Sequence, residues 1–236
     1  METVSKIMTE LKKLGNESAR KTYARHGAPE NMFGVRIADL KTISKRIKGQ
    51  QELAYGLYET GNIDAMYLAG IVADGSQMTK KLLETWAKSA NWHMLEEYSV
   101  PGVAAESEHG RSLALKWIRS KKAGIASCGW CTYSGLISVR DDSELDLDEI
   151  KQLLKTVEEQ IDDAPNRVRY TMNGFVISVG TYVEPLLKQA KATAKKLGVV
   201  SVDMGDTSCK VPLASAYIKK VEDAGRVGRK RKSAKC

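Results

Sequence analysis

Apolar residues recur at the three- and four-residue spacing of a helix face along most of the chain, and strand-like alternation is rare. In the first segment Val4, Ile7, Leu11 and Leu14 share one face, and Gly15 follows as a stop signal. Similar segments continue almost to the C-terminal end. The expected helices cover residues 4–14, 17–26, 37–47, 51–59, 63–73, 78–90, 92–99, 108–120, 123–139, 146–161, 166–180, 183–197 and 213–224.

From residue 51 onward the expected helices form pairs joined by short turns, and a new pair begins roughly every 35 to 40 residues. This is the length of an α-solenoid repeat of the HEAT or armadillo kind, in which antiparallel helix pairs stack on one another. No tight sequence signature recurs between the units. The pattern predicts an all-α, HEAT-like solenoid that forms one domain over residues 1–225 and is followed by a tail at residues 226–236.

One segment near the C-terminal end departs from the helical pattern. The β-prone runs 199–203 and 207–211 flank the turn sequence Met204-Gly205-Asp206. Such runs predict a small β-hairpin at about residues 199–211. Because a lone hairpin is marginally stable in water, we expect this one to pack on the solenoid or to project from it as a finger.

Positive charge is concentrated in the last fifth of the chain. The whole chain has 37 Lys and Arg against 29 Asp and Glu, a net charge of +8, and residues 188–236 alone carry 13 of these cations against four acids. Such a concentration favours a polyanionic partner, above all nucleic acid. The tail residues that predict phosphate contacts are Arg229, Lys230, Arg231 and Lys232. The alternative for this basic run is a flexible, solvated chain end.

The apolar runs, the N-terminal residues and the cysteines exclude several classes of protein and of site. The longest apolar runs are too short to span a bilayer, and the N-terminal residues lack a signal-peptide pattern, so we expect a cytoplasmic protein without a membrane partner. The segment 128–131 has C-x-x-C spacing, but no strand precedes it and no second pair exists, which favours helix packing over a redox or zinc site. No metal and no small-molecule cofactor are expected, and reduced thiols are expected at Cys128, Cys131, Cys209 and Cys236.

The architecture and the charge together suggest a nucleic-acid ligand. Stacked helix pairs form a concave face that can follow a DNA duplex when its rim is positive. Affinity would then come mainly from phosphate contacts and would fall steeply with salt. The alternative is a protein-binding repeat module, which is the commoner use of such solenoids.

Two segments, residues 89–97 and 31–36, resemble the AlkD-like DNA alkylation repair family of HEAT-like proteins. The similarity extends diffusely over most of the chain. In that family, a Trp followed four residues later by an Asp lies at the DNA-facing groove, a second Trp lies on a later helix, and an Arg comes between them. Active members remove bases that carry a cationic alkyl adduct, without flipping the nucleotide into a pocket.

The resemblance implies roles for individual residues of this chain. Trp92 matches the first aromatic position, Glu96 stands where the family has its catalytic Asp, Phe175 falls at the second aromatic position, and Tyr23 matches a tyrosine near the groove. A fixed carboxylate stabilises an oxocarbenium-like sugar, and aromatic faces attract cations. Glu97 takes the place of Glu96 if the register slips by one. Core packing remains the alternative for Trp92 and Phe175, and a solvated helix charge for Glu96.

The family arginine has no counterpart here, because residues 125–130 contain no basic side chain. The expected hairpin resembles that of a related subgroup, which carries a β-hairpin in the groove and is thought to bind unusual or branched DNA; Lys210 is its candidate backbone contact. We therefore expect a DNA-binding protein of the alkylation repair type, with duplex or branched DNA as its partner and with weak or absent base excision. An active glycosylase for cationic N3- or N7-alkylated purines and a protein-binding module remain the alternatives.

Overall fold

The computed structural model describes residues 2–235, and Met1 and Cys236 lie outside the described part of the chain. All regular elements of this part are helices, and it contains no strand. The α-helices are α1 (Val4–Leu14), α2 (Glu17–Arg25), α3 (Ile37–Arg46), α4 (Gln51–Glu59), α5 (Ile63–Val72), α6 (Lys80–Ser89), α7 (Val100–Ala105), α8 (Gly110–Ile118), α9 (Ala123–Val139), α10 (Leu147–Gln160), α11 (Asn166–Tyr182), α12 (Leu187–Leu197) and α13 (Ala214–Asp223). Shorter turns are η1 (Gly75–Gln77), η2 (Leu95–Ser99), η3 (Asp142–Glu144) and η4 (Glu184–Leu186).

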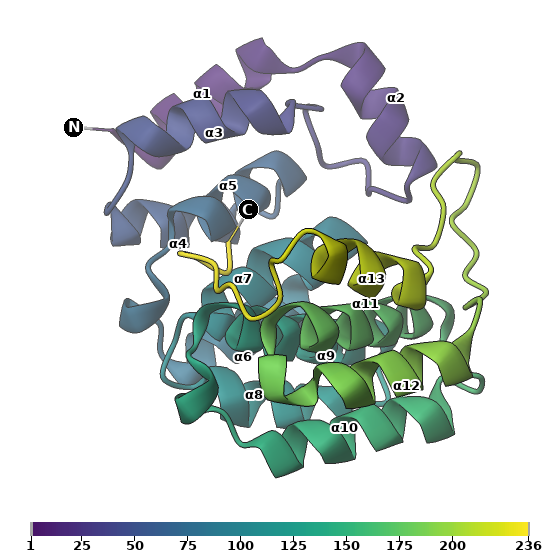
Figure 1. Cartoon of the computed structure of the whole chain (residues 1–236). Helices are drawn as coiled ribbons and strands as arrows, with labels where there is room; N and C mark the ends of the chain where they lie inside the picture. Colours follow the sequence, from purple (N-terminus) through teal and green to yellow (C-terminus); the bar gives the residue numbers. More distant parts are fainter. Residues whose placement is uncertain (1, 236) are drawn as a thin grey trace.

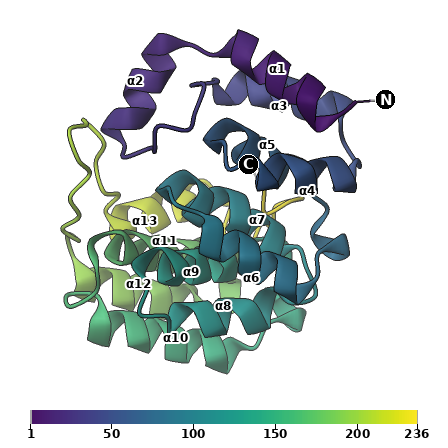
Figure 2. The same cartoon turned by 180° about the vertical axis from the view of Figure 1, so that it is seen from behind.

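The helices form two stacked layers, as the HEAT-like prediction requires. The inner layer contains α5, α7, α9, α11 and α13, which pack successively on one another, and the outer layer contains α4, α6, α8, α10 and α12. The first three helices, α1 to α3, lie at one end of the stack (Figures 1 and 2). The prediction of an all-helical solenoid is therefore confirmed.

Local sequence signals explain why the helices begin where they do. Asn16, Asn62 and Asp146 each precede a helix, and their side-chain oxygens accept a backbone N–H from that helix's first turn at 3.0 to 3.2 Å. The outer helices carry one apolar face each, whereas the inner helices α5 and α9 are largely buried and are apolar on several faces. No helix in the described part of the chain combines the length and the apolarity needed to cross a membrane.

The C-x-x-C segment lies within the helix α9, where close packing explains its composition. Gly129 faces α8 so closely that a β-carbon there would lie 2.4 Å from the backbone nitrogen of Ile118. Cys128 is buried, Cys131 is half-buried, and both are free thiols. These residues therefore allow α8 and α9 to approach one another, as the helix-packing interpretation predicted.

The predicted β-hairpin is wrong. Residues 198–213 form an extended loop whose two arms run side by side towards α2 (Figure 1), but no ladder of backbone hydrogen bonds joins the arms in this part of the structure. A side chain takes the place of the ladder: Asn166 donates to the carbonyl of Asp203 at 2.7 Å and accepts its N–H at 2.8 Å. Gly205, with φ of 70°, makes the turn at the tip. We call residues 198–213 the extended loop.

The expected helix at residues 92–99 differs in shape and length. Residues Leu95–Ser99 form a π-helical turn, η2, and the chain continues directly into α7 instead of ending near Ser99. Pro101 lies in the first turn of α7, directly after the π-helical turn.

The C-terminal tail runs as a strap along one edge of the inner layer, beside the C-terminal ends of its helices (Figure 1). At α11, Gly228 donates its N–H to the carbonyl of Thr181 at 2.9 Å. At α9, Arg231 donates its N–H to Ser138 at 2.8 Å. At α5, the Lys235 ammonium donates to the carbonyl of Ala73 at 2.7 Å. We call residues 226–235 the C-terminal strap, because its donors satisfy carbonyl groups that helix ends leave free.

Candidate nucleic-acid interface

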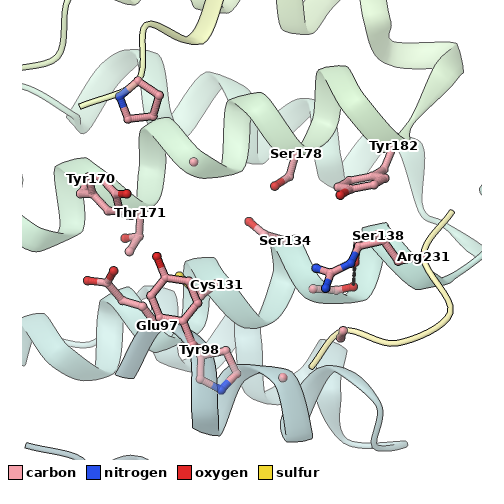
Figure 3. Close-up of a pocket in the computed structure, with 16 residues that line it drawn as sticks. Glu97, Tyr98, Cys131, Ser134, Ser138, Tyr170, Thr171, Ser178, Tyr182 and Arg231 are labelled. Carbon is pink, nitrogen blue, oxygen red and sulfur yellow. Dashed lines mark hydrogen bonds between the residues drawn. The ribbon is translucent and has the colours of Figure 1, made fainter. Parts of the chain in front are cut away.

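A cavity of about 290 Å³ opens on the inner face of the solenoid. It lies between η2 with α7, α9 and α11, and the strap and Pro212 at the end of the extended loop close its sides (Figure 3). Glu97, Tyr98 and Tyr170 gather at one end of this cavity, and Arg231 and Tyr182 lie at the other. We call it the groove cavity. Its lining combines small residues and hydroxyl groups with two charged residues, Glu97 and Arg231.

The π-helical turn η2 determines which glutamate faces the groove cavity. In an α-helix, the residue four positions after Trp92, which is Glu96, would lie on the same face as Trp92. A π turn contains one residue more than an α turn. In η2, Glu97 and Tyr98 therefore face the cavity. Of the two glutamates that the sequence offered, Glu97 is therefore the one that lines the groove cavity. π-helical turns occur frequently at functional sites.

Glu97 forms a bidentate ion pair with Arg167 from the first turn of α11. Its two carboxylate oxygens accept from Nε at 2.7 Å and from Nη2 at 2.5 Å, and its side chain is 2% exposed. Burial raises the pKa of the Glu97 carboxyl to about 7, and the Arg167 hydrogen bonds oppose that effect. Both oxygens of the carboxylate are therefore already bonded to Arg167.

Arg167 connects Glu97, at one end of the groove cavity, to the extended loop. Its guanidinium lies over the ring of Tyr170, 4.4 Å from the centroid, which is a cation–π geometry. Nη1 also lies 3.7 Å from the sulfur of Met204 in the extended loop. Because the neighbouring Asn166 anchors Asp203, the first turn of α11 holds both the groove carboxylate and the loop close to its tip.

The other titratable groups around Glu97 are held neutral. Burial raises the pKa values of the Tyr98 and Tyr170 phenols and of the Cys131 thiol, so all three stay protonated at neutral pH. Burial lowers the pKa of His93 to about 4, and the charge of Arg167 acts in the same direction. The site therefore offers hydrogen-bond donors and no activated nucleophile.

Glu96, the predicted catalytic residue, points away from the groove cavity towards the start of α9. A β-carbon at Gly124 would lie 2.0 Å from its Oε1, so the carboxylate covers the first turn of that helix. Burial raises the pKa of Glu96, and Arg167 opposes the shift. A carboxylate at a helix N-terminus interacts favourably with the helix dipole. The geometry therefore gives Glu96 a position that stabilises α9.

Trp92 and Tyr23 pack against each other and do not line the groove cavity. Trp92 is 4% exposed, its indole N–H donates to the carbonyl of His26 at 3.0 Å, and its ring centroid lies 5.4 Å from that of Tyr23. The Tyr23 hydroxyl donates to the carbonyl of Val35 at 2.9 Å. The pair therefore joins α2 to the segment before η2, which is the packing alternative stated for Trp92.

Phe175 lies in the core of the C-terminal half. It has no exposed surface, and its ring centroid lies 5.2 Å from that of Trp130 and 5.8 Å from that of Tyr133. A ring without exposed surface cannot stack on a DNA base or sugar. Its position in α11 corresponds to the packing alternative, and α11 presents Tyr170 to the groove cavity instead.

Most of the predicted phosphate-binding cations are exposed, but one of them is bonded to other groups of the protein. Lys210 is exposed on the extended loop, and Arg229, Arg231 and Lys232 are exposed on the strap. Lys230 is turned inward and bonded to the protein, with a side chain that is 15% exposed. Much of the remaining C-terminal charge lies on the outer helix α12, where two of the lysines form ion pairs with acidic residues: Lys191 with Glu222 and Lys196 with Glu158.

Sequence reasoning missed Arg167, Tyr98 and Tyr170. Arg167 lies 70 residues from Glu97, and no local pattern links the two positions. One weak signal was present, because Arg167 is a cation in the first turn of a helix, where the helix dipole disfavours a cation that has no partner.

The stacked helix pairs and their inner face place the chain among the HEAT-like repeat solenoids. The sequence profile of the family described as DNA alkylation repair enzyme matches residues 7–197. The chain belongs to this family.

Individual relatives extend over nearly the whole chain. The uncharacterized proteins Lin0241 of Listeria innocua and Lmo0209 of Listeria monocytogenes are each 34% identical over 229 residues, which cover 94% of this chain and 99% of theirs. A solved structure, from a new family described as related to the HEAT-like repeat DNA glycosylases with affinity for branched DNA structures, covers 100% of both chains with a TM-score of 0.91 and 37% sequence identity.

Proposed function

We propose that this protein binds branched DNA along the inner face of its solenoid and does not excise bases. The observation that carries the proposal is the state of Glu97, whose two oxygens are both bonded to Arg167 and whose side chain is 2% exposed. The branched-DNA affinity described for the protein with the similar solved structure supports the choice of ligand.

Base excision needs a carboxylate that can reach the sugar. An oxocarbenium-like transition state gains most from a negative charge fixed beside it and free to interact with it. Glu97 is neutralised by Arg167, Glu96 lies against α9, and the aromatic rings of Trp92 and Phe175 are buried. These positions support a binding role in preference to a catalytic one.

Exposed cations near the groove cavity supply contacts to the DNA backbone. Arg231 lines one end of the cavity, and Lys210 lies on the extended loop that projects towards α2 (Figure 1). On α2, the exposed Lys21 and Arg25 carry further positive charge towards the loop tip, where Gly205 approaches the Arg25 carbonyl. Cations at these positions favour phosphates without regard to sequence.

Replacing Glu97 tests the proposal directly. We expect E97Q to bind a four-way DNA junction about two- to three-fold more tightly than the wild type at pH 8, because the substitution removes one negative charge from the cavity floor. Base release from methylated duplex DNA should stay at background for both proteins. Fluorescence anisotropy measures the first quantity and release of labelled bases the second.

The matched control is E96Q in the same π-helical turn, which should leave junction affinity unchanged because Glu96 faces α9. Base release by the wild type that either substitution abolishes would overturn the proposal and favour a glycosylase. Undetectable junction binding by the wild type would favour a protein-binding module.

Charge reversal on the extended loop provides a second test. We expect K210E to weaken junction binding by roughly three- to ten-fold, to the same extent for arms of different sequence, because phosphate contacts carry no sequence information. Lys195→Glu, an exposed lysine on the outer helix α12, is the matched control and should have little effect. A loss confined to one arm sequence would contradict the assignment of Lys210 to the DNA backbone.

A further inference from the structure

A second hollow, of about 650 Å³, lies at the edge of the inner layer and is separate from the groove cavity. It is lined by the end of α3, by the C-terminal ends of α5, α7 and α9, and by the strap. Five of its lining residues are cations and one is an acid. The cations are Lys45, Lys48, Arg140, Lys232 and Lys235, and the acid is Glu106. We call this feature the rim hollow.

The single acid of the rim hollow is already satisfied by the protein. Glu106 accepts from the Ser233 hydroxyl at 2.5 Å and from the Ala234 N–H at 2.9 Å, and the Lys235 ammonium lies 3.2 Å from its second oxygen. It therefore cannot neutralise the remaining cations of the hollow.

The other cations are available to a ligand. Lys45, Lys48 and Lys232 are exposed, and within residues 2–235 no ion pair engages them. Arg140 makes only a 3.7 Å contact with Glu144, which is itself 53% exposed. Several cations from three separate segments of the chain thus face one open hollow, an arrangement that suits a ligand with several anionic groups.

The strap reduces the electrostatic repulsion that an anion would meet at this edge of the molecule. C-terminal ends of helices carry partial negative charge and would repel phosphates. Lys235 donates to the carbonyl of Ala73, Lys230 donates to Ile137 and Tyr182, and the strap backbone bonds further carbonyls. The strap donors therefore offset the partial negative charge of these helix ends beside the exposed lysines.

The strap also connects the two features. Arg231 lines the groove cavity, and the next residue, Lys232, lines the rim hollow. A DNA strand that leaves the inner face across the strap would pass from one feature directly into the other. A linear duplex continues straight along its axis, whereas a branched DNA has a further arm that can turn over the edge.

We propose that the rim hollow binds the phosphate backbone of a second arm of a branched DNA molecule. This inference rests on the proposed function and adds the site that distinguishes a junction from a duplex. The groove contacts one arm, and Lys45, Lys48, Arg140 and Lys232 contact another.

The test is a double charge reversal on α3 and the turn that follows it, K45E/K48E, measured by fluorescence anisotropy with a four-way junction and with a linear duplex of the same arm sequence. We expect the variant to lose roughly ten-fold in junction affinity at about 0.1 M salt, and to have a shallower salt dependence for the junction by about two phosphate contacts. Duplex affinity should change by less than about two-fold, because the duplex does not reach the hollow.

The matched control is K81E/K88E on the outer helix α6, which reverses two exposed lysines, one of them also in the last turn of its helix. A second variant, K45Q/K48Q, removes the charges without adding acids and should give a smaller loss of the same kind. An unchanged junction affinity, or an equal loss for junction and duplex, would overturn the rim hollow assignment. Failure of the wild type to bind either DNA would instead overturn the proposed function.

Discussion

Replacing Arg167 by alanine should lower the free energy of unfolding by about 3 to 5 kcal/mol at pH 8. The substitution leaves Glu97, with its 2% exposed side chain, without the partner that bonds both of its oxygens. An unpaired buried carboxylate is costly because neither solvent nor a counter-charge stabilises it. The variant also loses the contact of the guanidinium with Tyr170 and its approach to Met204.

The loss should depend on pH in a defined direction. In the wild type, burial already raises the pKa of Glu97 to about 7, and without Arg167 burial acts unopposed and raises it further. A carboxyl whose pKa is raised on folding contributes stability at low pH and loses that contribution as pH rises through the folded-state value. We therefore expect R167A to be less destabilised at pH 6, where Glu97 takes up a proton, than at pH 8. Urea unfolding at the two pH values measures this difference.

Arg111 provides the comparison for Arg167. It also forms a bidentate ion pair, with Glu149, but its side chain is 54% exposed. R111A should lose less than about 1 kcal/mol at either pH, since exposed pairs contribute little. Equal stability losses of R167A at pH 6 and pH 8 would show that Glu97 does not titrate in this range.

The contrast between the helices and the site shows what the sequence can and cannot predict here. Helix periodicity and N-caps are local properties, and the predicted bounds of most helices agree with the structure, as at Asn16 and Asn62. The prediction failed where a local pattern had two solutions. The valine- and threonine-containing runs of the extended loop were compatible with a hairpin, but the loop is held instead by Asn166 of α11, which makes two hydrogen bonds to the backbone of Asp203.

The functional site was less predictable than the fold because it depends on register and on distant partners. Because of a single π turn, Glu97 faces the groove cavity and Glu96 does not. The amino-acid types at residues 95–99 gave no signal from which this turn could be predicted. Arg167 forms the ion pair with Glu97. The resemblance to the family had directed attention to residues 125–130, which contain no arginine. The sequence also did not show which side chains of a helix are exposed. Phe175 and Tyr170 belong to the same helix, but only Tyr170 lines the cavity.

The basic tail illustrates the same limit. In the sequence, Lys230 and Lys232 are equivalent members of one cationic run. In the structure, the Lys230 ammonium donates to the carbonyls of Tyr182 at 2.6 Å and Ile137 at 3.0 Å and pairs with Asp142 at 2.8 Å, whereas Lys232 is exposed at the rim hollow. One cation therefore holds the ends of α9 and α11 together, and the other faces the proposed ligand.

Replacing Lys230 by methionine should lower the free energy of unfolding by roughly 2 to 3 kcal/mol. Methionine retains an unbranched side chain of similar length but leaves two helix-end carbonyls and the Asp142 carboxylate without their donor. Lys232→Met removes the same charge from an exposed position and should change stability by less than about 0.5 kcal/mol. Urea unfolding of the two variants under identical conditions provides the measurement.

Junction binding should show the opposite order. At a temperature where both variants are folded, K232M should weaken binding of a four-way junction, because Lys232 lines the rim hollow, and K230M should bind like the wild type, because its ammonium faces the protein. If the two substitutions reduce junction affinity equally, the tail acts through its total charge and not through the positions that the strap fixes. A stable K230M protein would show that the strap is not anchored by its inward lysine.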